Sequence, residues 1–352
     1  MRIIKYIVIA WFLTNYSFSK DLYYSDEYEI QFSSENIKFK KEEFINSIKQ
    51  ISFKKLTNSL LTDYEYKKLN NITTIELINN FLFSLNINEE KINNKNYSSK
   101  IQITYDKSKI INFLINNNIN FIPYEPEKFL IIVFDQKLFS EKILSKENKF
   151  YEYLYLNKFK YEYFDIPNLD INDRYIIKKE DFLSKKIKNH EQLVNKYKYK
   201  NILLVHSISD LYGVKINSYV YKNYNFQLID NIYLSEINYE LFFNNLHNKA
   251  LNYWKNHNIV HSSNINNITC RIKTLNLIEL KKIKEIIKNN NIIKKITANS
   301  IAYNNSTYNL LFYGNLDILI NSLYKDKLEL NSYKDKCNIK ILWRIKITLI
   351  II

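Results

Sequence analysis

Apolar and polar residues follow two different rhythms along this chain, and together they predict a mixed α+β fold. Apolar side chains recur with helical spacing in residues 40–61 and again in residues 235–256. Two uninterrupted apolar runs, FLIIVF at 129–134 and ILLVH at 202–206, are typical of strands buried on both faces. Residues 214–228 alternate on both sides of a short turn, which predicts a β-hairpin.

We therefore expect an α+β protein of two or three small segments with mixed or antiparallel sheets. The last segment has the order strand, helix, strand, strand, helix, strand, which is the order of a ferredoxin-like unit. The pattern leaves open whether the first two segments form one domain or two. The expected parts are a leader at 1–19, an N-terminal domain at 20–140, a middle domain at 141–262 with the strand 202–206 and the hairpin 214–228, and a C-terminal domain at 263–352.

The two cysteines begin the first and last strands of the C-terminal segment. In a ferredoxin-like unit these strands lie side by side and antiparallel, so their starting residues lie at opposite ends. At roughly 3.3 Å per residue, Cys270 and Cys337 would then be about 20 Å apart. A disulfide tolerates Cα separations only up to about 7 Å. This arrangement predicts two free thiols.

Residues 1–19, MRIIKYIVIAWFLTNYSFS, have the layout of a secretory signal. Arg2 and Lys5 form a positive start, an apolar run follows, and Ser17 and Ser19 place small residues where a signal peptidase cuts. The apolar run is shorter than the about 20 residues that a membrane span needs. We expect an exported, periplasmic protein with no integral span after signal removal. A retained anchor or a buried N-terminal strand are the alternatives.

The positive charge is carried almost entirely by lysine. The 352 residues include 51 Lys and Arg against 36 Asp and Glu, for a formal charge of +15. Lys, Asn, Ile, Tyr and Phe are abundant together, which indicates A/T-rich coding. Arginine, which makes bidentate contacts to phosphate and guanine, stands only at Arg2, Arg174, Arg271 and Arg344. Nucleic acid is therefore not the expected partner.

Glycine is almost absent, which excludes whole classes of nucleotide-binding protein. P-loops and dinucleotide fingerprints need several glycines close together, and the chain has only Gly213 and Gly314. Both stand at predicted turns next to strands, where a positive φ is the usual requirement. Asn315 is expected to cap the helix that follows Gly314.

Histidines with metal-ligand spacing occur once. His257 and His261 stand four residues apart, with His247 before them, and such a pair can share a metal on one helix face. Asn256 and Asn258, however, are expected to end the helix between the pair. We interpret these histidines as polar residues at a helix end and expect no metal.

Three carboxylates in the link between the apolar runs are also candidates for calcium ligation or for an acid–base pair. Asp165, Asp170 and Asp173 lack the alternating spacing and the glycine of a calcium loop. Asp173, which precedes Arg174, is expected to form a turn or a helix cap. Neither a metal nor a cofactor is predicted.

One compact group of residues could suggest a serine hydrolase. His206, Ser207, Ser209 and Asp210 follow the apolar strand 202–206. No glycine forms the sharp turn that usually exposes a serine nucleophile. The prediction is a polar loop that ends a buried strand, and no catalytic residue is assigned.

Tyrosines alternate in the middle segment at positions 151–163. Tyr151, Tyr153 and Tyr155, followed by Tyr161 and Tyr163, would form one face of an exposed strand. Aromatic rows of this kind can bind peptide or glycan. We select Tyr151, Tyr153 and Tyr155 as the candidate binding surface.

The chain resembles an exported proteobacterial family, known as domain of unknown function twenty sixty-six. The resemblance lies in LTNSLL at 56–61, the strand and helix at 101–119, FLIIVF at 129–134, IPNLDINDRYIIKKEDF at 166–182, and residues 292–323 with Gly314-Asn315 at a strand-to-helix turn. It implies an exported bacterial protein without an established activity. Residues 202–228 also look like the small α+β modules of envelope proteins that bind partners, an analogy at the level of fold.

These observations predict a non-enzymatic binding or assembly module of the cell envelope that contacts protein or cell-wall polymer. An exported hydrolase is the first alternative, with residues 206–210 as its only candidate. A cytosolic nucleic-acid-binding protein, in which the N-terminal run is a core strand, is the second.

Overall fold

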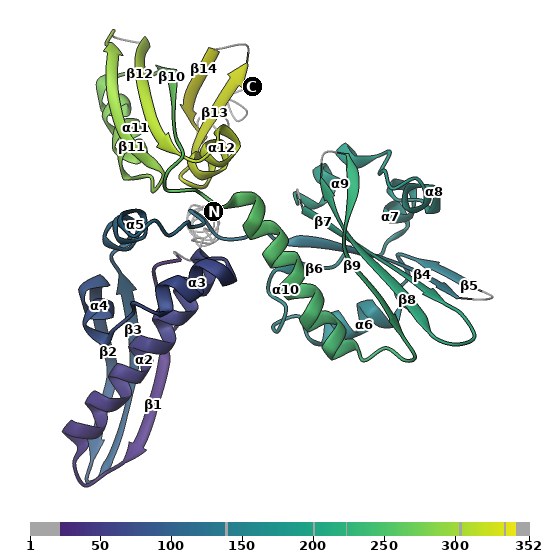
Figure 1. The fold of residues 1–352 in the computed structure, drawn as a ribbon, viewed down its shortest axis with the longest axis horizontal. Helices are drawn as coiled ribbons and strands as arrows, with labels where there is room; N and C mark the ends of the chain where they lie inside the picture. Colours follow the sequence, from purple (N-terminus) through teal and green to yellow (C-terminus); the bar gives the residue numbers. More distant parts are fainter. Residues whose placement is uncertain are drawn as a thin grey trace, which may run out of the picture. The chain divides into compact units, whose positions relative to one another are not determined.

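The computed structural model describes residues 22–137, 140–199, 201–222, 224–302, 305–333 and 336–342. Within these residues the chain forms an α+β protein with three sheets, as the sequence predicted (Figure 1). Two compact units are distinguished by their internal contacts. Unit 1 takes the chain up to Tyr124 and from Val260 onward, and unit 2 spans Glu125–Ile259. The predicted signal at 1–19 lies outside the described residues.

The first part of unit 1 is a three-stranded antiparallel sheet covered by a long helix. Tyr97, Ile101 and Ile103 alternate along one strand and are almost completely buried on one face. That face packs against the helix, where Phe53 meets Tyr105 with ring centroids 5.8 Å apart. The elements are β1 (Tyr28–Ser33), α2 (Ile37–Leu60), α3 (Asp63–Asn70), α4 (Ile75–Phe81), β2 (Leu82–Asn93), β3 (Asn96–Tyr105) and α5 (Lys107–Asn116), and the strand order is β1-β3-β2.

The second part of unit 1 is a five-stranded sheet with two helices. Its strand order is β11-β12-β10-β14-β13. Apolar residues of the helices, such as Leu280, Ile283 and Leu319, are buried on one face of the sheet. The elements are β10 (Ile265–Lys273), α11 (Leu277–Asn289), β11 (Ile293–Ser300), β12 (Asn305–Tyr313), α12 (Leu316–Lys325), β13 (Leu328–Tyr333) and β14 (Lys336–Ile341).

This sheet follows the predicted ferredoxin-like order up to α12 and then departs from it. The sequence analysis expected one final strand, but the described residues form a hairpin, β13 and β14. The second strand of the hairpin lies beside β10 and runs parallel to it, while β13 lies at the edge. Residues 343–349 of the predicted last strand lie outside the described residues.

The added hairpin overturns the prediction of free thiols. Because β14 runs parallel to β10, Cys270 and Cys337 lie opposite one another in register, with Cα atoms 4.4 Å apart. They form a disulfide. The expected separation was wrong because it assumed an antiparallel neighbour for β10, and the hairpin reverses the chain once more.

The two parts of unit 1 are joined by a short backbone contact. Phe121 and Val260 form an antiparallel bridge, and both side chains are fully buried. Within the first part, the Ile122 amide next to this bridge donates to the carbonyl oxygen of Leu60 at 2.7 Å. Segments far apart in the sequence therefore belong to one unit.

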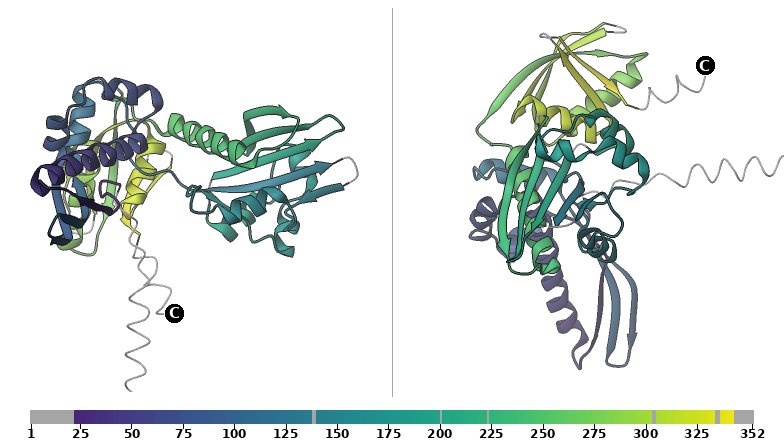
Figure 2. Two further views of the ribbon diagram at one scale, coloured as in Figure 1. Left: turned by 90° about the horizontal axis from the view of Figure 1, so that it is seen from below. Right: turned by 90° about the vertical axis from the view of Figure 1, so that its right-hand side faces the viewer.

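Unit 2 is built on a mixed sheet with helices on both faces (Figure 2). The order is β5-β4-β7-β8-β9, β6 adds to β4, and β4 pairs parallel with both β6 and β7. The elements are β4 (Phe129–Lys137), β5 (Ser140–Ile143), α6 (Lys149–Leu156), β6 (Phe164–Asp165), α7 (Ile171–Ile176), α8 (Lys179–Leu183), α9 (His190–Tyr197), β7 (Asn201–Ser209), β8 (Val214–Lys222), β9 (Asn225–Leu234) and α10 (Tyr239–Asn258).

The predicted strand 202–206 and hairpin 214–228 correspond to β7, β8 and the start of β9. The boundary predicted at 140 differs from the structure, because the FLIIVF strand β4 is the parallel neighbour of β7 and belongs to unit 2. On one face of the sheet, Lys249 of α10 donates to Asp230 at 2.5 Å. On the other face, Phe182 of α8 packs edge-on against Phe134. No helix within the described ranges has the length and apolar character needed to cross a bilayer.

The two glycines serve different structural purposes. Gly314 has φ 85°, the left-handed conformation that was predicted, and Asn315 caps α12 by accepting from the Ile318 amide at 2.9 Å. Gly213 is not at positive φ. A Cβ atom there would lie 2.4 Å from the carbonyl oxygen of Leu234. Glycine is therefore needed at position 213 because the backbone of Leu234 lies too close to leave room for a side chain.

Candidate binding site

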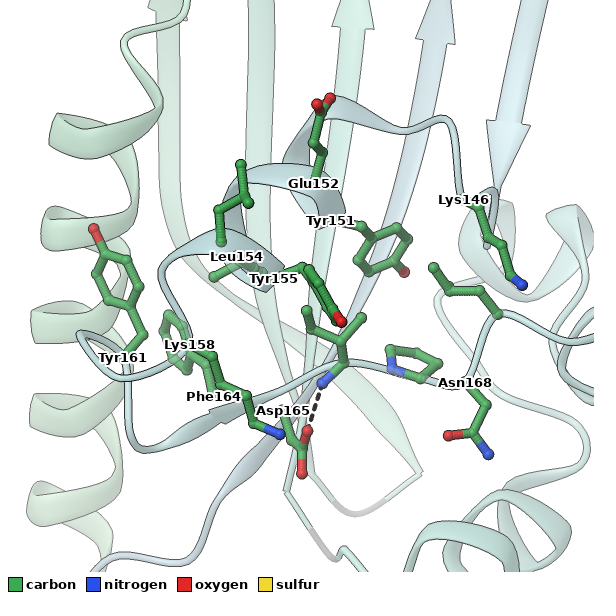
Figure 3. Close-up of a pocket in the computed structure, with 14 residues that line it drawn as sticks. Lys146, Tyr151, Glu152, Leu154, Tyr155, Lys158, Tyr161, Phe164, Asp165 and Asn168 are labelled. Carbon is green, nitrogen blue, oxygen red and sulfur yellow. Dashed lines mark hydrogen bonds between the residues drawn. The ribbon is translucent and has the colours of Figure 1, made fainter.

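A pocket of about 590 Å³ opens in unit 2 between α6 and the chain segment around β6 (Figure 3). Four of its lining side chains are aromatic or aliphatic and nearly inaccessible to solvent, namely Tyr151, Leu154, Tyr161 and Phe164. The remaining lining residues are Lys146, Glu152, Tyr155, Leu156, Lys158, Asp165, Ile166, Pro167, Asn168 and Leu169.

Tyr151 closes a gap in the edge of the sheet beneath this pocket. Strand β6 pairs with the first two residues of β4 and β5 pairs from Phe134 onward, so the middle of this edge has no strand partner. The Tyr151 hydroxyl accepts a hydrogen bond from the Val133 amide at 2.8 Å. Burial raises the pKa of Tyr151, so the hydroxyl stays neutral in this position.

The wall formed by residues 164–169 is held by tyrosines of the neighbouring segment. Asp165 accepts from its neighbouring amide, Ile166, at 2.9 Å and from the Tyr199 hydroxyl at 2.5 Å. Burial raises the pKa of Tyr199 to about 12, and the hydrogen bond to Asp165 acts in the same direction. The Asn168 amide donates to the Tyr197 hydroxyl at 2.8 Å. These bonds fix the wall independently of any ligand.

Next to the wall is a buried carboxylate, Asp173, which anchors the whole arrangement. It is fully inaccessible and accepts from Tyr197 at 2.6 Å and from Lys196 at 2.7 Å. Asp170 and Asp173 also form a capping box at the start of α7, as the expectation of a turn or cap anticipated. Hydrogen bonding to Lys196 lowers the pKa of Asp170. These carboxylates are therefore engaged in structure, and Asp165 is engaged with Tyr199.

One residue of the wall has an uncommon backbone conformation. Leu169 has φ 57°, which lies in the left-handed region that bulky apolar residues rarely adopt. Such conformations persist only where the surrounding structure enforces them, and they cluster at ligand sites. Here the enforcing contacts are those of Asn168 and of the capping box that begins at Asp170.

The rim of the pocket is apolar and exposed, with charges of both signs. Tyr155 and Leu156 are 76% and 74% exposed although both are large and apolar in character. Lys146, Glu152 and Lys158 make no side-chain hydrogen bond or ion pair with any other residue in the described part of the chain. The rim is thus free to contact a partner.

The tyrosine row predicted from the sequence is real as a cluster but wrong as a strand. Positions 151–155 lie in α6, so the side chains at spacing two point in different directions. Tyr151 is buried, Tyr155 is exposed at the pocket rim, and Tyr153 is half-buried, stacked on Phe243 with ring centroids 5.6 Å apart. Of the three selected tyrosines, Tyr151 and Tyr155 line the pocket and Tyr153 does not, while Tyr161 of the same row also lines it.

Most of the other lining residues carry no signal of a site in the sequence. Leu154, Ile166 and Leu169 look like ordinary core positions, because an apolar residue gives the same signal in a pocket wall as in a core. In the proline-containing link, only the carboxylates are candidate site residues by their type.

The suggested hydrolase residues are not brought together. His206 and Ser207 are neighbours on β7 and therefore point to opposite faces of the sheet. Ser207 is fully buried, and His206 stacks on Phe134 with ring centroids 4.7 Å apart. Asp210 forms the following turn by accepting from the amides of Tyr212 and Gly213, both at 2.8 Å.

The histidines considered as metal ligands are likewise separated in role. His257 lies in the last turn of α10 and contacts the Tyr253 carbonyl oxygen through Nδ1 at 2.8 Å, while His261 follows the helix. His247 lies among Tyr161, Tyr163 and Phe164. No group of three metal-ligating side chains occurs among the residues that the structure describes.

Comparison of the sequence with family models and curated proteins adds no relative. No protein-family model matches the chain, and a search of curated proteins finds no similar sequence.

Proposed function

We propose that this protein is an exported, non-enzymatic binding module of the cell envelope, and that the pocket beside α6 holds an apolar side chain of a partner protein. Two observations support export: the signal-like segment at 1–19 and the disulfide between Cys270 and Cys337. Structural disulfides are common in oxidising compartments and rare in the cytosol. Membership of the exported family that the sequence resembles remains a prediction.

The pocket itself is the observation that carries the binding role. Its volume of about 590 Å³ lies within the roughly 300–1,000 Å³ of typical ligand sites. Aromatic and aliphatic side chains line much of it, and of these Tyr155 and Leu156 are exposed. Large apolar residues that stay exposed around a concave site are a mark of interaction surfaces.

The composition of the walls favours a protein over a sugar. A glycan needs many hydrogen-bonding partners for its hydroxyls, whereas Leu154, Ile166 and Leu169 supply only apolar surface. The polar groups deeper in the site, on Tyr151 and Asp165, are already used in internal hydrogen bonds. A bulky apolar side chain fits this environment, and Lys146, Glu152 and Lys158 are placed to contact the polar backbone and charges around it.

The experiment combines location with site-specific crosslinking. A photo-crosslinking amino acid is placed at Tyr155, and the same substitution at Tyr175, an exposed tyrosine on α7 that does not line the pocket, is the matched control. We expect the protein in the envelope fraction with a mature N-terminus near Lys20, and a defined protein adduct from position 155 only. Tyr155→Ala should lower capture of that partner, while Tyr175→Ala should not.

Three results would count against this proposal. A cytosolic protein that begins at Met1 contradicts export. A polymer adduct at position 155 contradicts the choice of a protein partner. Equal crosslinking from positions 155 and 175 means that the pocket has no special role.

A further inference from the structure

The C-terminal sheet of unit 1 has a second face that the helices do not cover. In the second half of β10 the side chains alternate: Cys270 and Ile272 are buried toward α11 and α12, while Thr269 and Arg271 are exposed on the other side. The neighbouring strands β12 and β14 continue this division in register, and β11 pairs with the far side of β12. We call this exposed side of β10 to β14 the basic sheet face.

The charges on the basic sheet face are predominantly positive. Arg271, Lys273 and Lys295 are exposed there, and none of them forms a hydrogen bond or ion pair with other residues that the structure describes. Lys340 forms an ion pair with Glu329 at 3.3 Å. Glu329 lies opposite Lys340 in the β13–β14 register and therefore on the same face. Arg271 is one of only four arginines in the chain and lies on the central strand.

Between these cations the face offers neutral hydrogen-bonding groups. Thr269 is opposite Asn309, which is in turn opposite Thr297, so one row of hydroxyl and amide groups crosses three strands. Another row joins Arg271 to Thr307 on one side and to Asn338 on the other. From Lys273 to the level of Lys295 the cations extend over about 20 Å along the strands, at roughly 3.3 Å per residue.

We propose that the basic sheet face binds an acidic polysaccharide. The free cations match carboxylates, and the rows of Thr and Asn side chains match the hydroxyls that every sugar unit carries. Single-stranded nucleic acid fits less well, because its recognition relies on aromatic side chains that stack on bases, and the rows at Thr269 and Arg271 contain hydroxyl, amide and guanidinium groups instead. This binding is independent of the pocket in unit 2.

The test is binding of the full mature protein to fluorescent oligogalacturonate at several salt concentrations. The variant Arg271→Gln/Lys273→Gln/Lys295→Gln removes the cations of the face. Its matched control, Lys281→Gln/Lys282→Gln/Lys288→Gln, removes the same charge from α11 on the opposite side of the sheet. Circular dichroism and thiol titration show whether both variants keep the fold and the disulfide.

We expect the face variant to bind about tenfold or more weakly and to lose up to about three units of salt slope. The helix variant should bind like the original protein, and neutral dextran should not compete. Equal losses in both variants would overturn the proposal, because attraction would then follow net charge alone. Tighter binding of single-stranded RNA than of oligogalacturonate would also overturn it, as would absence of binding at physiological salt.

Discussion

Cys270 and Cys337 lie opposite one another on the parallel strands β10 and β14 and are joined by a disulfide, 67 residues apart in the sequence. Both side chains are almost completely buried. The bond therefore ties the C-terminal hairpin to the central strand of its sheet. It closes a long loop, and loops of this size give a large entropic contribution to stability.

Replacing both cysteines with alanine is expected to lower the free energy of unfolding of unit 1 by up to about 4 kcal/mol. The reason is that the unfolded chain gains the freedom that the cross-link removes. Urea unfolding of the oxidised, reduced and substituted proteins measures the effect. The reduced protein should resemble the substituted one. Two titratable thiols in native protein purified without reductant would contradict the structure.

A second prediction concerns the hydrogen bond between the Tyr151 hydroxyl and the edge of the sheet below the pocket. Tyr151→Phe leaves the Val133 amide buried without an acceptor, which costs about 1–3 kcal/mol. Tyr155→Phe is the control, because this hydroxyl is on the same helix but exposed. Hydrogen exchange at Val133 should accelerate in the first variant only. Unchanged protection there would show that water or another group replaces the tyrosine.

Much of the fold follows from apolar spacing, and the exceptions have identifiable causes. Strand β4 and the hairpin β8–β9 were predicted because their patterns are unambiguous. The hairpin of β13 was missed because a run of charged and polar residues hides its two buried positions, Leu328 and Leu330. Without β13, the strand beside Cys270 is expected to run antiparallel to β10, whereas β14 runs parallel to it. The sequence predicts a strand where α6 lies because Tyr151, Tyr153 and Tyr155 have the period of two of a strand, while the helical spacing of the buried Tyr151 and Leu154 spans only one turn.

The candidate site was only partly visible in the sequence for a related reason. Tyr151 and Tyr155 were selected by residue type, and their shared position depends on helical spacing that had not been assigned. The opposite wall is fixed by contacts such as Asn168 with Tyr197, 29 residues apart. No local pattern contains information about such a contact.

The two glycines allow conformation and space to be tested separately. Gly314→Asn should destabilise the protein less than Gly314→Ala, because asparagine tolerates the left-handed region better than alanine does. We expect alanine at this position to lower the free energy of unfolding by about 1–2 kcal/mol. Gly213→Ala and Gly213→Asn should both lower the free energy of unfolding by about 1–3 kcal/mol, because any Cβ atom at this position clashes with the Leu234 carbonyl oxygen. Thermal unfolding of the four variants distinguishes these patterns. Rescue by asparagine at Gly213 would be inconsistent with a steric cause.

We expect the stability of unit 2 to depend on pH through three half-buried histidines. Burial lowers the pKa of His190, His206 and His247, each of which therefore binds its proton more weakly in the folded protein than in the unfolded chain. The contribution to stability is complete above the unfolded pKa of about 6.5 and is lost as the pH falls through the folded pKa. Carboxylates whose pKa is lowered, such as Asp170, act only at more acidic pH.

His247 is the best position at which to measure this dependence. Its ring lies 5.2 Å from Phe164 and 6.0 Å from Tyr161 between centroids, so phenylalanine can replace it within the same aromatic cluster. We expect His247→Phe to reduce the loss of unfolding free energy between pH 7.5 and pH 5, and the exposed His261→Gln to leave it unchanged. Urea unfolding followed by circular dichroism at several pH values measures both. A pH dependence that is identical in the two variants would mean that protonation of His247 does not contribute to it.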